Sequence, residues 1–261
     1  IADPREFAAP AGRHRPGKLL SCSGTTMPPD WMTSVCIDTN LFLELYESEE
    51  DPGEIFADIG VLREQLVFPD IIFDEFLRNR PKVLDRIAED VRRRETGEVR
   101  VPSVLRGNPN VAALQRAGEE YNRGVRALYA DIQELIAEPA ADPVARAFTD
   151  LSRDPGVRVF RRTDDLITRA HRRKLLGNPP KSTGTDTVGD ELVWETLLLN
   201  LEGDLILVTR DRTYHYHAAY LTQEYRERIG GGLTITDRIS DALALAGRPP
   251  SPALVRFESR E

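Results

Sequence analysis

The pattern of apolar and polar residues alternates between short buried strands and amphipathic helices. Residues 34–38 (SVCID) and 205–209 (LILVT) are rich in β-branched and apolar residues, which is typical of strands covered on both faces of a parallel sheet. Shorter strand candidates lie at 67–68, 157–160 and 233–236. Because helical patterns separate these runs, the chain is predicted to have an α/β fold with a central, mainly parallel sheet.

The predicted helices have apolar residues at helical spacing and turn-forming residues at their ends. They are expected over 39–47, 54–66, 69–79, 164–176, 190–200, 218–228 and 237–246. Asn40 is a candidate N-cap for the first of them. Residues 81–153 have an almost wholly helical pattern, and we interpret them as an insertion in a single domain that spans 34–246. Such a long excursion is expected to form a flap over the functional site or a wall beside it.

Both ends of the chain lack a sustained period. Residues 1–33 are rich in Pro, Gly, Ser and Thr and are expected to be a flexible tail, and residues 247–261 are expected to be a C-terminal tail. The chain starts with Ile, and both methionines, Met27 and Met32, lie just before the first predicted strand. Part of the N-terminal tail is therefore open to being non-native.

Composition places the chain among soluble globular proteins, with 40% hydrophobic and 30% charged residues. No apolar run approaches the ~20 residues that cross a bilayer, and the N-terminus lacks the order of a signal peptide. We therefore expect a cytoplasmic protein without a membrane partner. Cys22 and Cys36 cannot form a disulfide framework, and Cys36 is expected to be an inert thiol in the core.

Charge is unevenly distributed along a chain whose formal net charge is -8. Acidic residues are concentrated at 44–58, whereas residues 156–182 hold eight Lys or Arg against two Asp, a local balance of +6. This basic segment is open to two interpretations, a solvated helix face or a track that contacts phosphates.

Two aspartates fall at the ends of the strongest strands. Asp38 closes the run at 34–38, and Asp211 follows the run at 205–209 by one residue. Ligand sites of parallel α/β sheets lie at the carboxyl ends of strands, so the pair indicates a shared site. Taken singly, each Asp is also a good helix cap.

Two further acids are candidates for the same site. Asp190 opens a predicted helix, where an acid at the helix N-terminus is the plain alternative. Glu75 lies in the apolar run IIFDEFL, where an unpaired charge would be costly to bury. Its neighbour Asp74 competes for the role, and we favour Glu75.

A set of carboxylates without Cys or His partners has a specific chemical meaning. Hard oxygen ligands suit Mg²⁺ or Mn²⁺ rather than zinc. Converging like charges are unstable unless a cation neutralises them, and such a cation can activate water and polarise a phosphodiester. One or two ions are both compatible with the pattern.

The order and context of these acids resemble the PIN-domain nucleases. In that family an Asp closes the first strand in an IDTN or LDTN context, a Glu follows in a helix, an Asp opens a later helix, and an Asp follows a strand in a T-x-D context. The corresponding segments here are IDTN at 37–40, FDEF around Glu75, GDELVWETLL around Asp190 and VTRD ending at Asp211. The form GD-x-x-x-W-E is similar to a larger bacterial subgroup with a helical insertion.

The resemblance covers residues 34–80 and roughly 155–246. It implies a three-layer α/β/α fold with a mainly parallel sheet and a helical insertion. It also implies a metal-dependent endoribonuclease in which Mg²⁺ or Mn²⁺ is held by Asp38, Glu75, Asp190 and Asp211. RNA is the expected substrate and single-stranded DNA the alternative, while a homodimer or a regulatory protein partner is left open.

Supporting residues are expected around the acids. Asp186 is a further candidate ligand, although a solvated loop acid is the plainer interpretation. Thr39, Asn40 and Thr209 are expected to orient the acids or to cap the backbone. Glu195 is a candidate to face the site, but ordinary surface charge is the plainer interpretation of Glu191 and Glu195. His215 and His217 are two residues apart, a spacing that does not favour a zinc site on a helix.

The candidate phosphate contacts are the basic residues of the segment at 156–182 and those flanking Asp211. They are Arg158, Arg161, Arg162, Arg172, Arg173, Lys174, Lys181, Arg210 and Arg212.

Two other function classes compete with the nuclease. One is a catalytically silent PIN-fold scaffold that binds nucleic acid or protein, which the presence of all the acids disfavours. The other is a phosphatase or receiver-like domain, which also has Asp at strand ends. That class favours a D-x-D setting, and the residue two after Asp38 is Asn40.

Overall fold

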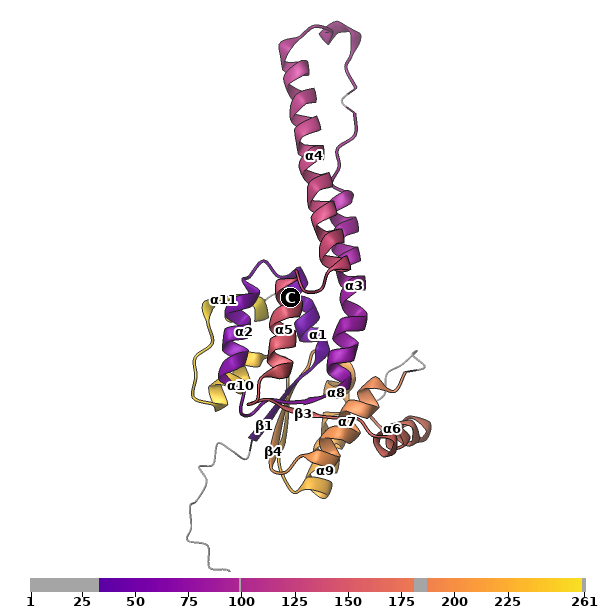
Figure 1. Cartoon of the computed structure of the whole chain (residues 1–261), viewed down its shortest axis with the longest axis vertical. Helices are drawn as coiled ribbons and strands as arrows, with labels where there is room; N and C mark the ends of the chain where they lie inside the picture. Colours follow the sequence, from indigo (N-terminus) through magenta and orange to yellow (C-terminus); the bar gives the residue numbers. More distant parts are fainter. Residues whose placement is uncertain (1–32, 99, 181–186, 260–261) are drawn as a thin grey trace, which may run out of the picture.

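A parallel sheet forms the centre of the computed structural model, which describes residues 33–98, 100–180 and 187–259 (Figure 1). Its strands are β1 (Thr33–Ile37), β2 (Val67–Pro69), β3 (Arg158–Phe160), β4 (Asp204–Val208) and β5 (Leu233–Thr236). One sheet has the order β1-β4-β5, β2 pairs with β3, and a parallel bridge between Val35 and Leu66 joins the two parts. All these pairings are parallel, as predicted.

The two strongest predicted strands are direct neighbours at the centre. β1 and β4 pair in register from Thr33–Asp204 to Ile37–Val208. Their apolar side chains from Val35 and Leu205 onward are almost completely buried. Uninterrupted apolar strands need cover on both faces, so the prediction of adjacent central strands is confirmed.

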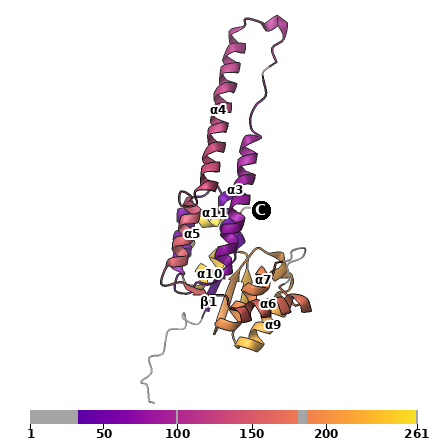
Figure 2. The same cartoon turned by 45° about the vertical axis from the view of Figure 1, so that its right-hand side comes forward.

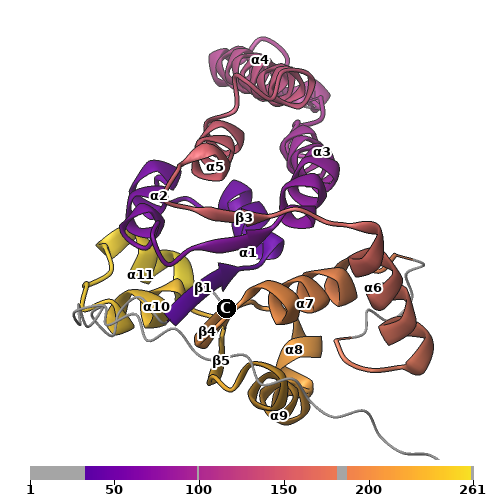
Figure 3. The ribbon, with the colours of Figure 1, turned by 60° about the horizontal axis from the view of Figure 1, so that its bottom comes forward.

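Helices cover both faces of the sheet, which gives the expected α/β arrangement (Figures 1 and 3). α2, α5, α10 and α11 pack together on one side, and α6, α7 and α9 on the other. The helices are α1 (Thr39–Glu44), the 3₁₀ turn η2 (Leu45–Glu47), α2 (Pro52–Val61), α3 (Ile71–Arg92), the 3₁₀ turn η3 (Ser103–Leu105), α4 (Pro109–Ala137), α5 (Pro143–Arg153), α6 (Asp164–Leu176), α7 (Gly189–Asn200), α8 (Arg212–Tyr216), α9 (Ala218–Ile229), α10 (Ile239–Leu245) and α11 (Pro252–Glu258).

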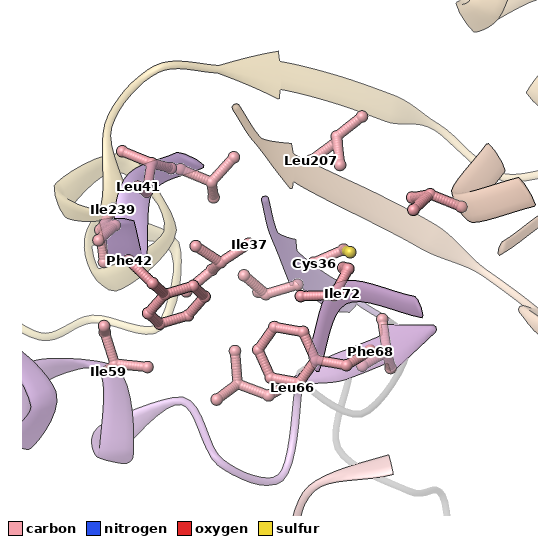
Figure 4. Close-up of a cluster of buried hydrophobic side chains, with 14 of the residues drawn as sticks. Cys36, Ile37, Leu41, Phe42, Ile59, Leu66, Phe68, Ile72, Leu207 and Ile239 are labelled. Atoms are coloured by element: carbon pink, nitrogen blue, oxygen red, sulfur yellow. The ribbon is translucent and has the colours of Figure 1, made fainter. Parts of the chain in front are cut away.

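The core between the sheet and the first helices is aromatic and aliphatic (Figure 4). Phe42 of α1 is its centre, with ring centroids 4.5 Å from Phe148 and 6.1 Å from Phe68. Burial of each such side chain contributes about 1.5–3 kcal/mol. Cys36 is completely buried, as predicted, and burial raises its pKa far above the usual range, which keeps the thiol protonated and unreactive.

A helical hairpin projects from the body of the molecule. α3 runs through Pro81 without a break, so the insertion has no boundary at that residue, and α4 packs antiparallel to α3. Asn122 ties the chain beyond α3 to α4, since it donates to the carbonyl of Thr96 at 2.9 Å and accepts from its amide at 2.9 Å. Figures 1 and 2 show the hairpin pointing away from the sheet, so the predicted flap over the site is wrong. The alternative of a wall beside the site stays a prediction, since α3 begins beside the sheet.

A buried ion pair fixes the base of the hairpin. Arg80 of α3 donates through Nε to Asp142 at 2.6 Å, and both side chains are at most 2% exposed. Asp142 also accepts from the amides of Val144 and Ala145, which caps α5, and from the hydroxyl of Tyr46. α5 then packs against α2, so the last part of the expected insertion belongs to the core.

The C-terminal segment is part of the fold rather than a tail. Ser251 caps α11 by accepting from the amide of Leu254 at 3.1 Å, and Leu254 and Phe257 are buried against the core. This corrects the expected boundary at residue 247. No helix of the described segments combines the length and the apolar character that spanning a bilayer requires.

Candidate metal centre

The four predicted acids gather at the carboxyl edge of the sheet. Asp38 follows β1, Asp211 follows β4, Glu75 lies at the start of α3 just after β2, and Asp190 lies in the first turn of α7. Parallel strands end at one edge, which brings these segments together. The charges of the other three acids contribute to raising the pKa of Asp190, and those of Glu75 and Asp211 contribute to raising the pKa of Asp38.

The Asp38 side chain bonds to Thr209 rather than capping the helix that follows it. It occupies the N-cap position of α1, yet its side chain makes no capping bond. Instead Oδ2 accepts a hydrogen bond of 2.6 Å from the hydroxyl of Thr209. Burial, the largest cause, raises the pKa of Asp38 to about 6, and the charges of Glu75 and Asp211 add to it against the lowering effect of the Thr209 bond.

The pKa of Asp190 is raised further than that of Asp38. Burial raises its pKa to about 7, and the charges of Asp211, Asp38 and Glu75 contribute in that order. The buried Tyr214 lies beside it and donates through its hydroxyl to the backbone carbonyl of Asp190 at 3.3 Å. A cation beside such a carboxyl group stabilises its charged form, because the cation offsets both the cost of burial and the repulsion from the neighbouring acids.

Glu75, rather than Asp74, joins the cluster. Its pKa is raised by burial and by Asp211, and lowered by the charge of Arg78 and by a 3.4 Å hydrogen bond from Thr39. Asp74 is exposed and forms an ion pair with Arg162. The one-residue offset turns the two side chains to different faces of α3.

Asp211 caps a helix and also lies among the acids at this edge of the sheet. Its side chain accepts from the amide of Thr213 at 2.7 Å, which caps α8 as one interpretation predicted. Its own amide donates to the Thr209 hydroxyl at 3.0 Å. Thr209 thus bridges Asp38 and Asp211, and one hydroxyl fixes the relation between the two segments.

The supporting residues divide into two kinds. Thr39 and Thr209 contact acids directly, through their bonds to Glu75 and Asp38. Asn40 is exposed, and in the described part of the chain it bonds none of the acids. Its predicted role as N-cap is also wrong, because Asp38 holds that position.

Two residues of the predicted basic track lie elsewhere. Arg173 is 3% exposed and forms ion pairs with Glu195 and Glu224, so no surface is left for a phosphate. Arg158 begins β3 and therefore lies at the amino edge of the sheet, opposite the acids. Arg173 is therefore wrong as a phosphate contact, and Arg158 lies away from the edge that holds the acids, because position along the chain does not reveal which side of the fold each arginine faces.

The other basic candidates differ in their availability. Arg162 is paired with Asp70 and Asp74, Arg210 is paired with Glu44, and Lys174 donates to the carbonyl of Thr187. Arg161, Arg172 and Arg212 are exposed and form no ion pair with the described Asp or Glu residues, whereas Arg162 is exposed but paired. Lys181 and the candidate ligand Asp186 lie outside the described residues.

Glu191 and Glu195 are not surface charges. Glu195 is 6% exposed and pairs with Arg173, which in turn anchors α6 to α7 and α9. Glu191 is completely buried, and neither carboxylate oxygen has a hydrogen-bond partner in the described structure. Burial raises the pKa of Glu191. The interpretation of both as ordinary surface charge is wrong.

Two further residues at the site were not predicted from the sequence. Tyr214 is buried next to Asp190, and Arg78 is an exposed cation near Glu75. Helical spacing could have indicated both, since Tyr214 follows Asp211 by three residues and Arg78 follows Glu75 by three.

The chemistry of the acids fits a hard divalent cation. The donors are all oxygens, and their shared negative charge is the state that a cation relieves. Within the described residues, no three His, Cys, Asp or Glu side chains are already arranged as a metal-binding group. Mg²⁺ commonly needs only one or two carboxylates, with waters and substrate phosphates completing its shell. The residues therefore fit the ion without a preformed cage.

The raised pKa values give a prediction for the metal-free protein. A carboxyl group whose pKa is higher in the folded state binds more protons there, so stability falls as pH rises from the ordinary aspartate range to about 7. Asp190→Asn removes the contribution of Asp190 to this fall in stability. In EDTA the variant should gain about 1–3 kcal/mol relative to the parent between pH 5 and pH 8.

Urea unfolding at the two pH values measures this difference. Saturating Mn²⁺ at pH 8 should remove the advantage of the variant, because the cation neutralises the acids in the parent. A variant equally or less stable than the parent at pH 8 in EDTA would show that the charges do not repel one another.

Comparison with known families identifies the family of the chain. The family model described as PIN domain matches residues 35–214, which include the four acids. The chain therefore belongs to the PIN domain family. PIN domains are typically nucleases and generally depend on divalent metals. Neither the curated proteins nor the solved structures include a match.

Proposed function

We propose that this protein is a divalent-metal-dependent nuclease that hydrolyses phosphodiester bonds, with RNA rather than DNA as its substrate. One observation carries the proposal. Burial and mutual repulsion raise the pKa of Asp38 to about 6 and that of Asp190 to about 7 at the carboxyl edge of the sheet. Perturbed acids that face one another mark functional sites, and a cation is their natural counter-charge.

The chain's own residues would hold that cation and keep the acids in place. Asp38, Glu75, Asp190 and Asp211 would supply oxygen ligands. Bound Mg²⁺ or Mn²⁺ would neutralise negative charge at the scissile phosphate and lower the pKa of an attacking water. The hydroxyls of Thr209 and Thr39 would keep Asp38 and Glu75 in position for the cation.

Substrate binding would use the exposed cations near this edge. Arg78 lies close enough to Glu75 to lower its pKa, and it is exposed. Arg161, Arg172 and Arg212 are exposed members of the predicted track, and none of the three forms an ion pair with the described Asp or Glu residues. Arginine pairs well with phosphate through its planar fork of donors, and such contacts position the backbone without reading sequence.

The test is a cleavage assay on mixed labelled RNA and DNA with Mn²⁺, with EDTA and with metal restored. We expect RNA to be cut in the presence of Mn²⁺, cleavage to stop in EDTA, and excess Mn²⁺ to restore it. Cleavage that persists in EDTA would contradict the metal dependence. A pure protein that binds RNA but cuts neither substrate would favour the catalytically silent scaffold.

A further inference from the structure

The amino edge of the sheet, opposite the acids, holds a cavity of about 1000 Å³. Three connections converge there: the turn after α2, the residues at the start of β3 and the segment after α10. α2 and α10 pack against each other and bring these connections together (Figures 1 and 3). Because the strands are parallel, this cavity and the candidate metal centre lie at opposite ends of the sheet.

The charged groups of the cavity are mainly arginines. Arg63, Arg158 and Arg248 line it, with Glu64 as the only acid among its lining residues in the described structure. None of the three arginines forms an ion pair with an Asp or Glu among the residues that the structure describes. This contrasts with Arg80, Arg162, Arg173 and Arg210, each of which is paired with a carboxylate. Within residues 33–98, 100–180 and 187–259, the cavity thus has excess positive charge without a paired carboxylate on its arginines.

Arg158 is held in place and partly desolvated. Its Nη2 donates to the hydroxyl of the buried Ser34 at 2.7 Å, which fixes the guanidinium against the start of β1. Burial is the largest cause that lowers the pKa of Arg158. An anion near this guanidinium would offset the cost of that desolvation.

The remaining lining suits a ligand with an apolar part. Ala57, Val61, Leu62 and Ala246 contribute apolar surface. Gly156 permits close packing, because a Cβ at that position would lie 3.3 Å from Cγ of Arg63 and 3.2 Å from Oδ1 of Asp154. That Asp154 oxygen accepts from the Gly156 amide at 2.8 Å, so it is engaged by the backbone. The cavity size is at the upper end of the range for small-molecule sites, about 300–1,000 Å³.

We propose that this cavity binds a nucleoside di- or triphosphate, with its phosphates on Arg63, Arg158 and Arg248 and its base against the apolar wall. Arginine donors match phosphate oxygens in geometry and charge. The site is separate from the candidate metal centre and does not depend on the proposed nuclease activity. A terminal phosphate of an oligonucleotide has the same chemistry, and the experiment distinguishes the two sources.

The experiment is calorimetric titration with ATP and with inorganic pyrophosphate, in EDTA, on the full chain carrying Asp38→Asn to exclude hydrolysis. We expect ATP to bind, and Arg63→Ala, Arg158→Ala and Arg248→Ala each to raise its Kd about tenfold or more, as loss of a charged hydrogen bond should. Arg116→Ala is the matched control, since Arg116 is an exposed arginine of the projecting α4. It should leave the Kd within about twofold.

Each other outcome overturns the assignment. Failure of ATP to bind would show that the cavity is not a nucleotide site. So would Arg63→Ala and Arg248→Ala variants that bind ATP with the Kd of the parent. These two variants keep the test decisive even if loss of the Ser34 bond destabilises Arg158→Ala. A 5′-phosphorylated 12-mer that binds where ATP does not would instead assign the cavity to a nucleic-acid end.

Discussion

Replacing Asp38 with Asn should reduce Mn²⁺-dependent RNA cleavage by at least about a thousandfold, since charge stabilisation by a bound metal contributes several kcal/mol to the transition state. Asparagine has the shape of aspartate, and its carbonyl oxygen can still accept the hydrogen bond from Thr209. What is lost is one negative charge at the site. The variant should therefore fold normally, and removal of a repelling charge should make it more stable than the parent in EDTA at pH 8.

The matched control for this change is Asp74→Asn. Asp74 lies next to Glu75 in sequence but is exposed and paired with Arg162, so its loss should change the cleavage rate by less than about threefold. Initial rates on labelled RNA at saturating Mn²⁺, with unfolding curves for each protein, measure both effects. Parent-like cleavage by a folded Asp38→Asn protein would exclude Asp38 as a necessary ligand.

Replacing Arg173 with Met should lower the free energy of unfolding by about 3–5 kcal/mol, the usual consequence of removing one partner from a buried ion pair. The Arg173 side chain is 2% exposed, and it lies 2.7 Å from Glu195 and 2.5 Å from Glu224. It also donates to the carbonyl of Pro179. Methionine fills part of the volume but leaves two carboxylates without this buried counter-charge.

Arg172→Ala is the neighbouring control with the opposite expected profile. Arg172 is exposed, so its loss should change stability by no more than about 0.5 kcal/mol. If it contacts phosphate, RNA binding should weaken and the slope of log affinity against log salt should flatten by about one. Urea unfolding and binding titrations at several salt concentrations compare the two variants. An Arg173→Met protein as stable as Arg172→Ala would contradict the structural role of Arg173.

The fold was predictable where burial leaves a local signature. The β-branched runs at 34–38 and 205–209 predict strands covered on both faces, and the helical spacing of apolar residues at 164–176 and 190–200 predicts helices. The gathering of Asp38 and Asp211 was predictable from the same source, because parallel strands end at one edge. Local pattern therefore indicated both the architecture and the position of the acids.

The remaining features depend on contacts between distant segments. Arg172 and Arg173 are adjacent and chemically identical, and only the packing of α6 against α7, together with the ion pair to Glu224 of α9, buries the second. Arg158 lies in the basic segment, but its place at the start of a parallel strand puts it at the opposite edge from the acids. The helical pattern of residues 81–153 does not indicate in which direction the hairpin projects. The ion pair between Arg80 and Asp142 fixes the base of the hairpin.

The most direct test of the central claim is the affinity of the protein for Mn²⁺ in the absence of substrate, measured by calorimetry at pH 8. The four acids acting together should bind Mn²⁺ in the parent, and Asp38→Asn and Asp190→Asn should each weaken that binding by about tenfold or more, since each removes a charge and an oxygen ligand. Asp74→Asn should bind like the parent. Equal Mn²⁺ affinity in the parent and in folded Asp38→Asn and Asp190→Asn proteins would contradict a metal centre built from these carboxylates.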